Sequence, residues 1–147
     1  GGTDNIEINS LTGKITVTGF ASGDTVDIEN DSFDGAETAI TATQASATDV
    51  AHDRTIIYTK DASSTSVLTG GSETIADFTD LTDVAAYLEE GFAVANSEHF
   101  VFVLNDGTDS FVYINDNAAD TTIAAADLSL AAVIKDYTLA AADVAQS

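Results

Sequence analysis

The chain of 147 residues contains no cysteine, proline, methionine or tryptophan, and only four of its residues are Lys or Arg. Without cysteine there is no disulfide, no thiol nucleophile and no cysteine-ligated metal cluster. The 25 acidic residues bring the formal net charge to −21. Nucleic-acid binding and docking on anionic lipid both need clustered basic side chains, so this balance argues against both. No apolar run approaches the roughly 18 residues of a membrane span, so we expect no membrane insertion.

Signatures of catalysis are missing as well. His52 and His99 stand far apart, and neither belongs to a pair with the spacing of metal ligands. The chain has no Gly-x-Ser-x-Gly elbow, no phosphate-binding loop and no dinucleotide fingerprint. Carboxylates are so frequent that pairs arise by chance, and none stands out as a general acid in an apolar pocket. We therefore expect that the protein is not an enzyme.

The length and the apolar content of 44% predict a single β-rich domain over residues 1–147 with one modest core. Residues 31–54 are small and polar, which predicts a weakly determined loop or edge, and residues 139–147 are expected to form a flexible tail. The absence of Met and the opening Gly1-Gly2 predict a processed or excised piece of a longer protein.

Alternating polar and apolar residues predict strands in the first part of the chain. They occur over Asn5–Ile8, Lys14–Phe20 and Asp24–Glu29, with good turn sequences between them. This spacing predicts a short antiparallel meander. A further strand is predicted over Thr55–Lys60.

The second half of the chain has the strongest local patterns. Thr82 or Asp83 is expected to cap a helix over Val84–Glu90, with an extension past Gly91 to Ala95. Two aromatic-rich runs, His99–Leu104 and Phe111–Asn115, flank an Asp-Gly turn and predict a β-hairpin covered on both faces. A turn and another strand are expected near residues 128–134. Together these elements predict a mainly β fold, an antiparallel β-sandwich with one short helix.

Four aspartates are the leading candidate ligands for a metal ion, which would be Ca²⁺ because calcium prefers carboxylate, amide and carbonyl oxygens. A third candidate group is Asp24, Asp27, Asp31 and Asp34, of which the later pair follows the strand into a loop. Asp116 and Asp120 lie in an Asn- and Asp-rich stretch after the second hairpin strand and are the first candidates. Asp106 and Asp109 flank the hairpin turn and are the second. Ordinary turn chemistry accounts for both pairs without an ion. Two further explanations for the high charge need no ion, a halophile-type solvated surface and simple solubility.

A short pattern, Gly-x-acid-x-apolar, recurs three times, in Gly2–Ile6, Gly71–Ile75 and Gly107–Phe111. It suits a tight turn that enters a strand, whether or not the carboxylate also holds an ion. The pattern resembles the second half of the calcium-binding nonapeptide of repeats-in-toxin proteins. The complete nonapeptide and its tandem array are absent, so the chain is not itself a calcium β-roll.

Longer stretches are similar to the regions that follow such arrays in bacterial surface-layer and adhesin proteins exported by type I secretion. They are Ile15–Ile28, Ser72–Phe78, the hairpin with its preceding helix, and Thr122–Leu130. The resemblance implies a secreted protein of the bacterial cell surface. It also implies a non-catalytic structural or assembly module, aided by calcium, whose partners are further copies of itself or neighbouring domains of a larger surface protein. The alternative is a recognition module that binds a glycan or a host partner through its end loops.

Overall fold

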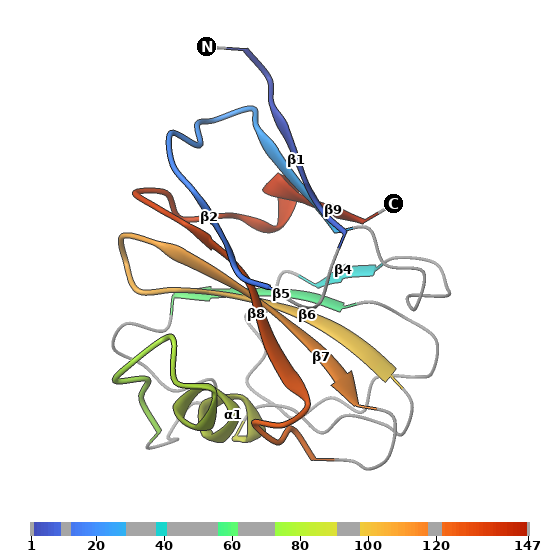
Figure 1. The fold of residues 1–147 in the computed structure, drawn as a ribbon, viewed down its shortest axis with the longest axis vertical. Helices are drawn as coiled ribbons and strands as arrows, with labels where there is room; N and C mark the ends of the chain where they lie inside the picture. Colours follow the sequence, from blue (N-terminus) through green and yellow to red (C-terminus); the bar gives the residue numbers. More distant parts are fainter. Residues whose placement is uncertain are drawn as a thin grey trace.

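The computed structural model describes residues 2–9, 13–28, 38–40, 56–61, 73–90, 98–117 and 122–146, with backbone alone at 38–40, 56–61, 98–100, 116–117, 141 and 146. Strands dominate these residues (Figure 1). In chain order the elements are β1 (Asn5–Ile8), β2 (Ile15–Val17), β3 (Thr25–Ile28), β4 (Thr38–Ile40), β5 (Ile56–Asp61), α1 (Leu81–Glu89), β6 (Glu98–Asn105), β7 (Ser110–Asn117), β8 (Leu128–Ile134), the short 3-10 turn η1 (Ala141–Asp143) and β9 (Val144–Gln146). The prediction of a mainly β protein with one short helix is confirmed for this part of the chain.

The strands form two sheets. The larger sheet has the order β2-β8-β7-β6-β5-β4, and the smaller has the order β1-β3-β9. In the larger sheet, β6–β7 and β7–β8 are antiparallel, whereas β2–β8, β4–β5 and β5–β6 are parallel. In the smaller sheet every pairing is parallel. The expectation of a purely antiparallel sandwich is therefore wrong.

The route of the chain explains the parallel pairs of the larger sheet. A short turn can join antiparallel neighbours only, whereas parallel neighbours need a long crossover, usually a helix. Between β5 and β6 the chain passes through α1, which returns it to the end of the sheet where β5 began. This is a strand-helix-strand unit, and the predicted strand, helix and strand in this order were its signal in the sequence.

The predicted antiparallel meander over the first thirty residues is also wrong. Its three strands exist, but β2 leaves the smaller sheet and pairs with β8 of the larger one, Ile15 with Ala132 and Val17 with Ile134. With β2 gone, β1 and β3 lie next to each other and run parallel, Asn5 beside Thr25. Alternation shows that a segment is a half-buried strand, but it does not show which strand is its neighbour.

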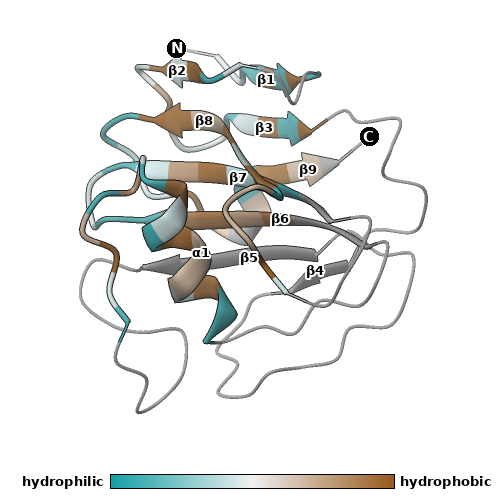
Figure 2. Ribbon diagram, turned by 60° about the horizontal axis from the view of Figure 1, so that its bottom comes forward, coloured by the Kyte–Doolittle hydropathy of each residue, from teal (hydrophilic) through white to brown (hydrophobic). Residues whose placement is uncertain are grey.

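Two apolar clusters lie on the two faces of the larger sheet, so that the molecule has three layers (Figures 1 and 2). One cluster joins the sheet to α1 through Phe102, Leu104, Phe111 and Tyr113, which meet Val84, Tyr87 and Leu88 of the helix. The other joins it to the smaller sheet. Its members from the two sheets include Val101, Val103, Val112 and Ile114 on one side and Ile8, Val26, Ile28 and Val144 on the other.

The N-cap of helix α1 lies two or three positions before the expected caps, Thr82 and Asp83. The N-cap is Asp80, whose carboxylate accepts a 2.9 Å hydrogen bond from the backbone N–H of Thr82. Thr82 and Asp83 instead belong to the first turn. Val84 and Leu88 are fully buried, as the predicted apolar face requires. The helix ends at Glu89, and the extension toward residue 95 falls outside the described residues.

The predicted hairpin is confirmed. Strands β6 and β7 pair antiparallel, with Phe102 opposite Tyr113 and Val103 opposite Val112. Successive residues alternate between the two clusters, so this hairpin is buried on both faces, as its apolar pattern predicts. Beyond β8, which confirms the strand near 128–134, the last described residues form η1 and β9. Within the segment expected as a tail, residues 144–146 thus form β9, which is an edge strand of the smaller sheet in the described part of the chain.

Candidate functional site

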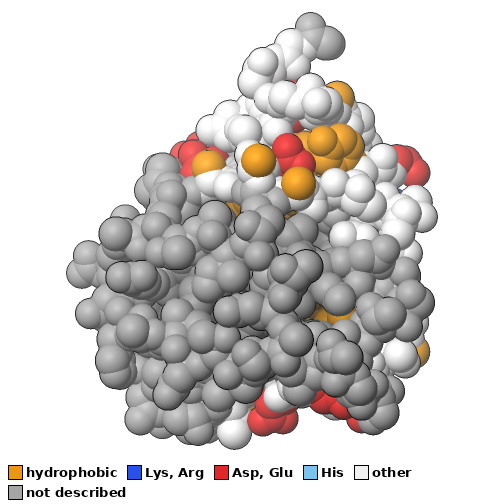
Figure 3. Space-filling model, turned by 180° about the vertical axis from the view of Figure 1, so that it is seen from behind, with side chains coloured by type: hydrophobic (Ala, Val, Ile, Leu, Met, Phe, Trp, Pro, Cys, Tyr) orange, Lys and Arg blue, Asp and Glu red, His pale blue; other side chains and the backbone are white. Residues whose placement is uncertain are grey.

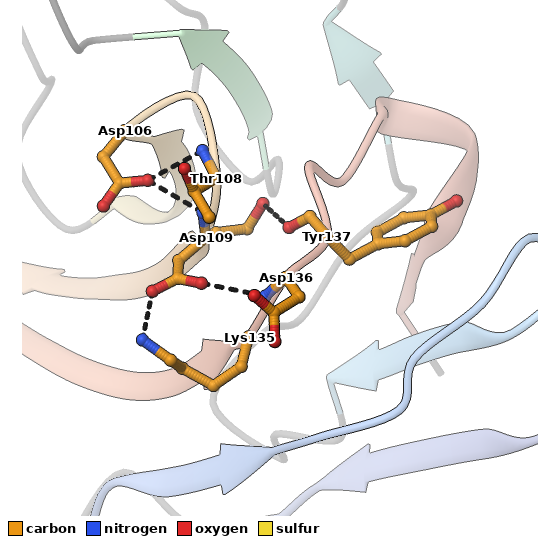
Figure 4. A network of polar contacts seen from close by, with 7 residues as sticks. Asp106, Thr108, Asp109, Lys135, Asp136 and Tyr137 are labelled. Atoms are coloured by element: carbon orange, nitrogen blue, oxygen red, sulfur yellow. Dashed lines mark hydrogen bonds and ion pairs between the residues drawn. The ribbon is translucent and has the colours of Figure 1, made fainter.

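The hairpin turn holds the second pair of candidate metal ligands (Figure 4). Asp106 Oδ1 accepts backbone hydrogen bonds from Thr108 N and Asp109 N, over 2.9 and 2.8 Å. Asn105 Oδ1 accepts a third from Gly107 N over 3.2 Å, and Gly107 has a positive φ of 88°, which glycine tolerates best. The side chains of Asn105 and Asp106 therefore accept hydrogen bonds from the backbone of their own turn. This is the ordinary turn role that the sequence offered for Asp106.

Asp109 is almost buried, with 7% of its surface exposed, and it ties the hairpin to the segment after β8. Its Oδ2 forms an ion pair with Lys135 Nζ, and its Oδ1 accepts a 2.8 Å hydrogen bond from the N–H of Asp136. The Lys135 ammonium, together with this N–H, holds the pKa of Asp109 below its ordinary value. The same contact raises the pKa of Lys135. A calcium ion at Asp109 would have to displace this ammonium group.

Ser110 extends the same connection. Its hydroxyl donates to the carbonyl of Tyr137 over 2.9 Å and accepts from the N–H of Leu139 over 2.8 Å. The Tyr137 ring packs against Phe20 at a centroid distance of 4.8 Å. Asp109 and Ser110 thus attach the start of β7 to residues 135–139, which lead the chain toward β9. Nothing in the local sequence pattern predicts this long-range contact.

The first pair of candidate metal ligands is only partly covered by the structure. Asp116 lies in β7 at the position opposite His99 of β6, and its side chain is outside the described residues. Asp120 lies outside them altogether, as does His52. A calcium site at Asp116 and Asp120 therefore stays a prediction. Within the described ranges, no three side chains among His, Asp and Glu are grouped so that they could hold a metal ion.

Asn115, directly before Asp116, is the most unusual polar side chain of the larger sheet. It is fully buried, and neither its Nδ2 nor its Oδ1 has a hydrogen-bond partner among the described residues. Burying an amide without partners costs about 1–3 kcal/mol in protein mutational data. By contrast, the nearby Tyr113 hydroxyl donates a 2.6 Å hydrogen bond to the carbonyl of Phe78. Burial raises the pKa of Tyr113, so this hydroxyl stays protonated.

Three turns repeat one hydrogen-bonding arrangement immediately before a strand. In each, the N–H of an alanine donates to the carboxylate of the aspartate three residues later, whose own N–H donates back to the alanine carbonyl. The distances to the carboxylate are 2.8, 3.2 and 2.8 Å, and each return bond measures 3.0 Å. The pairs are Ala21 and Asp24 before β3, Ala124 and Asp127 before β8, and Ala140 and Asp143 before β9. The spacing Ala-x-x-Asp before a strand was the signal for these turns, and our reading of the sequence missed it.

Asp24 has a second role that connects two strands. Its Oδ1 accepts a 2.9 Å hydrogen bond from the N–H of Asp4, the residue before β1, while its Oδ2 binds Ala21 N. These backbone hydrogen bonds hold the pKa of Asp24 below its ordinary value. Asp24 is 4% exposed. The carboxylate therefore fixes the starts of β1 and β3 side by side.

A separate polar surface covers the outer face of the smaller sheet. Thr25 Oγ1 donates to Asn5 Oδ1 over 2.9 Å, and Asn5 Nδ2 donates to Asp27 Oδ2 over a longer 3.4 Å. Glu7 pairs with Asp27 in the strand register. We call these four residues, Asn5, Glu7, Thr25 and Asp27, the β1–β3 polar ladder. It presents two carboxylates beside an amide and a hydroxyl. This set of groups suits the binding of a cationic group better than it suits catalysis.

No family model, no curated protein and no solved structure matches this chain. In the described part of the chain, no helix is long and apolar enough to cross a membrane. The described carboxylates at the turns mainly accept hydrogen bonds from backbone N–H groups of the protein itself. Among the residues that the structure describes, the β1–β3 polar ladder and the edge strands β1 and β2 are surfaces that another molecule could contact.

Proposed function

We propose that this protein is a non-catalytic structural or assembly module of a secreted bacterial cell-surface protein of the surface-layer or adhesin kind. One observation carries the assembly role: the edge strands β1 and β2, one from each sheet, lie on the same side of the sandwich (Figure 2). Edge strands expose unpaired backbone groups, which pair readily with a strand of another chain. Ile15 of β2 is 38% exposed and adds an apolar contact there. The secreted location rests on the sequence resemblance.

The alternative, a glycan-binding module, is less well supported. Glycan-binding surfaces commonly use exposed aromatic rings, which can stack on a sugar. Among the side chains that the structure describes, the rings of Phe20, Phe78, Phe102, Phe111 and Tyr113 are all buried. They belong to the two apolar clusters instead.

Sedimentation velocity tests the assembly role. The isolated chain should form dimers or larger species as its concentration rises. Otherwise it should form a complex when a neighbouring domain of its parent protein is added. Ile15→Ser combined with Thr16→Pro should reduce this association, because Thr16 lies in an edge strand where an added partner would need its N–H. Ala86→Ser on the exposed side of α1 is the matched control. A chain that stays monomeric under all these conditions, with and without a neighbouring domain, contradicts the proposal.

Calcium is proposed as a stabilising ion, with Asp116 and Asp120 as first ligands and Asp106 and Asp109 as second. Specific sites should raise the melting temperature more with calcium than with magnesium at matched ionic strength, because calcium accepts seven or eight irregular oxygen ligands. Screening alone would act alike for both salts. Asp116→Asn with Asp120→Asn should abolish the difference. Asp109 already forms an ion pair with Lys135, so this second site should bind calcium less well. Asp106→Asn should therefore reduce the difference between calcium and magnesium less. Equal stabilisation by both salts contradicts the calcium proposal.

A further inference from the structure

Strand β1 has a partner strand on one side only among the described residues, since β3 is its neighbour in the order β1-β3-β9. Asp4 directs both of its backbone groups toward β3: its N–H donates to Asp24 and its carbonyl accepts from Thr25 N, each over 2.9 Å. Alternate residues of a parallel strand direct these groups to opposite sides. The N–H and C=O groups of Asn5 and Glu7 therefore point to the open side, where one more strand can pair.

The β1–β3 polar ladder next to this open side carries uncompensated negative charge. Glu7 and Asp27 are register partners, and like charges directly opposite each other in neighbouring strands destabilise a sheet. Asp27 Oδ1 is buried and has no hydrogen-bond partner among the described residues. The one ion pair between described residues is Lys135 with Asp109, far from the ladder in sequence. Figure 3 shows red acidic side chains at several places and no blue Lys or Arg among its coloured atoms.

We infer that the open side of β1 receives an extended segment of a partner protein that carries Lys or Arg at alternate positions. The added strand would lie about 4.8 Å from β1 and exchange backbone hydrogen bonds with Asn5 and Glu7. The residue opposite Glu7 would direct its side chain to the same face as Glu7, so a basic group there meets the carboxylate. The residues between would be apolar, because they lie beside Ile6, which is half-buried.

The charge of the protein favours this occupant over a second copy of the chain. Two copies would each bring a net charge of −21 to the contact, whereas a basic segment lowers the repulsion between Glu7 and Asp27. The inference rests on the proposed assembly function and gives the chemistry of its partner at one of the two edges.

The test is a titration of the ¹⁵N-labelled protein with a capped peptide of alternating Lys and Val, followed by NMR. The control peptide has Glu in place of every Lys. We expect shifts of the amide signals concentrated at residues 4–8 and in β3, with the basic peptide only. A second peptide, N-methylated on one edge so that it has no N–H groups to donate there, should bind much more weakly if backbone pairing is needed.

Two variants of one residue separate the charge from the backbone. Glu7→Gln removes the carboxylate and should weaken binding about 2–5-fold, the effect of one exposed ion pair. Glu7→Pro also removes the outward N–H and should weaken it further, by about 2–10-fold. Glu89→Gln, an exposed residue at the end of α1, removes the same charge elsewhere and should leave affinity unchanged. The N-methylated peptide carries the test if Glu7→Pro does not fold.

Four outcomes overturn the inference. Shifts spread over the whole surface, with equal effects of Glu7→Gln and Glu89→Gln, would show non-specific attraction of a polycation. Equal binding of the Glu peptide would remove the charge argument. If the chain self-associates in sedimentation while both peptides leave β1 unaffected, the partner is a second copy, and only the assembly function stands. If the chain neither associates nor binds peptide, the proposed function fails with the inference.

Discussion

The two sheets differ in how far apart in the chain their neighbouring strands lie. The centre of the larger sheet, β6-β7-β8, joins consecutive strands in antiparallel pairs, and residues 101–105 and 111–115 are all buried. The smaller sheet joins strands that are never consecutive: β3 ends at Ile28, and its neighbour β9 begins at Val144. One face of the smaller sheet is covered and the other carries the polar ladder. Local pairs thus build the core of the protein, while distant pairs build its outer layer and open edge.

Truncation in the central hairpin should have the largest effect on stability. Phe102 is fully buried against α1 and the strands beside it. Phe102→Ala should lower the free energy of unfolding by about 3–5 kcal/mol, through lost burial and the cavity that remains. Chemical denaturation measures this. Ile28→Val in the smaller sheet should cost only about 0.5–1.5 kcal/mol. A greater loss from Ile28→Val than from Phe102→Ala would reverse the comparison between the sheets.

Asn115 offers a substitution in the same hairpin with the opposite sign. Because its buried amide has no described hydrogen-bond partner, Asn115→Leu should raise the free energy of unfolding by about 1–3 kcal/mol. Asn115→Asp, which buries a charge at the same place, should lower it and is the control. If Asn115→Leu destabilises the protein, the amide has a partner. That result would strengthen the case for an ion beside Asp116.

Acid should weaken the contact between the hairpin turn and the segment after β8. The folded-state pKa of Asp109 lies below its ordinary value, so the stabilisation is present at neutral pH and is lost as the pH falls below about 4. Asp109→Asn should cost about 1 kcal/mol at pH 7, a modest value because Lys135 is 43% exposed. It should also flatten the acid side of the stability profile. Lys135→Gln should flatten it partly, and an unchanged profile in both variants would exclude the pair as a source of acid sensitivity.

The smallest effect is expected at the edge of the larger sheet. Ile15 in β2 is exposed, so Ile15→Ser should change the free energy of unfolding by less than about 0.5 kcal/mol. The matched contrast is Ile134 of the neighbouring strand β8, which is fully buried. Ile134→Ser should lower the free energy of unfolding strongly, because it places a hydroxyl in the apolar core. A large loss with Ile15→Ser would mean that this edge is covered in solution.

The elements that could be predicted from the sequence are those determined by neighbouring residues. The hairpin β6–β7 follows from two apolar runs around an Asp-Gly turn, and α1 follows from the spacing of Val84 and Leu88. The cap was misplaced by two or three positions, because Asp80, Thr82 and Asp83 are all good N-cap residues. Only the structure shows that the Asp80 carboxylate accepts the hydrogen bond.

The candidate site was less predictable than the fold. Asp106 and Asp109 were correctly placed at the turn, but the partner of Asp109 is Lys135, which comes from the segment after β8. The β1–β3 polar ladder was not predicted at all. It exists because β1 and β3 became neighbours, and the pattern that suggested a meander assigned each of them a different partner.

The sequence by itself determined the hairpin, helix α1, the alternating strands of the first part of the chain, the high negative charge and the absence of thiol chemistry, but not β9, which was expected as a tail. These depend on residue type and on period, which are properties of short stretches of chain. Tertiary structure alone decided that β2 joins β8, that β3 joins β9 and that β5 and β6 run parallel. Which strands pair depends on how whole apolar faces, joined by long loops, are buried against one another. A period-two pattern shows that a strand has an apolar face, but not which distant face covers it.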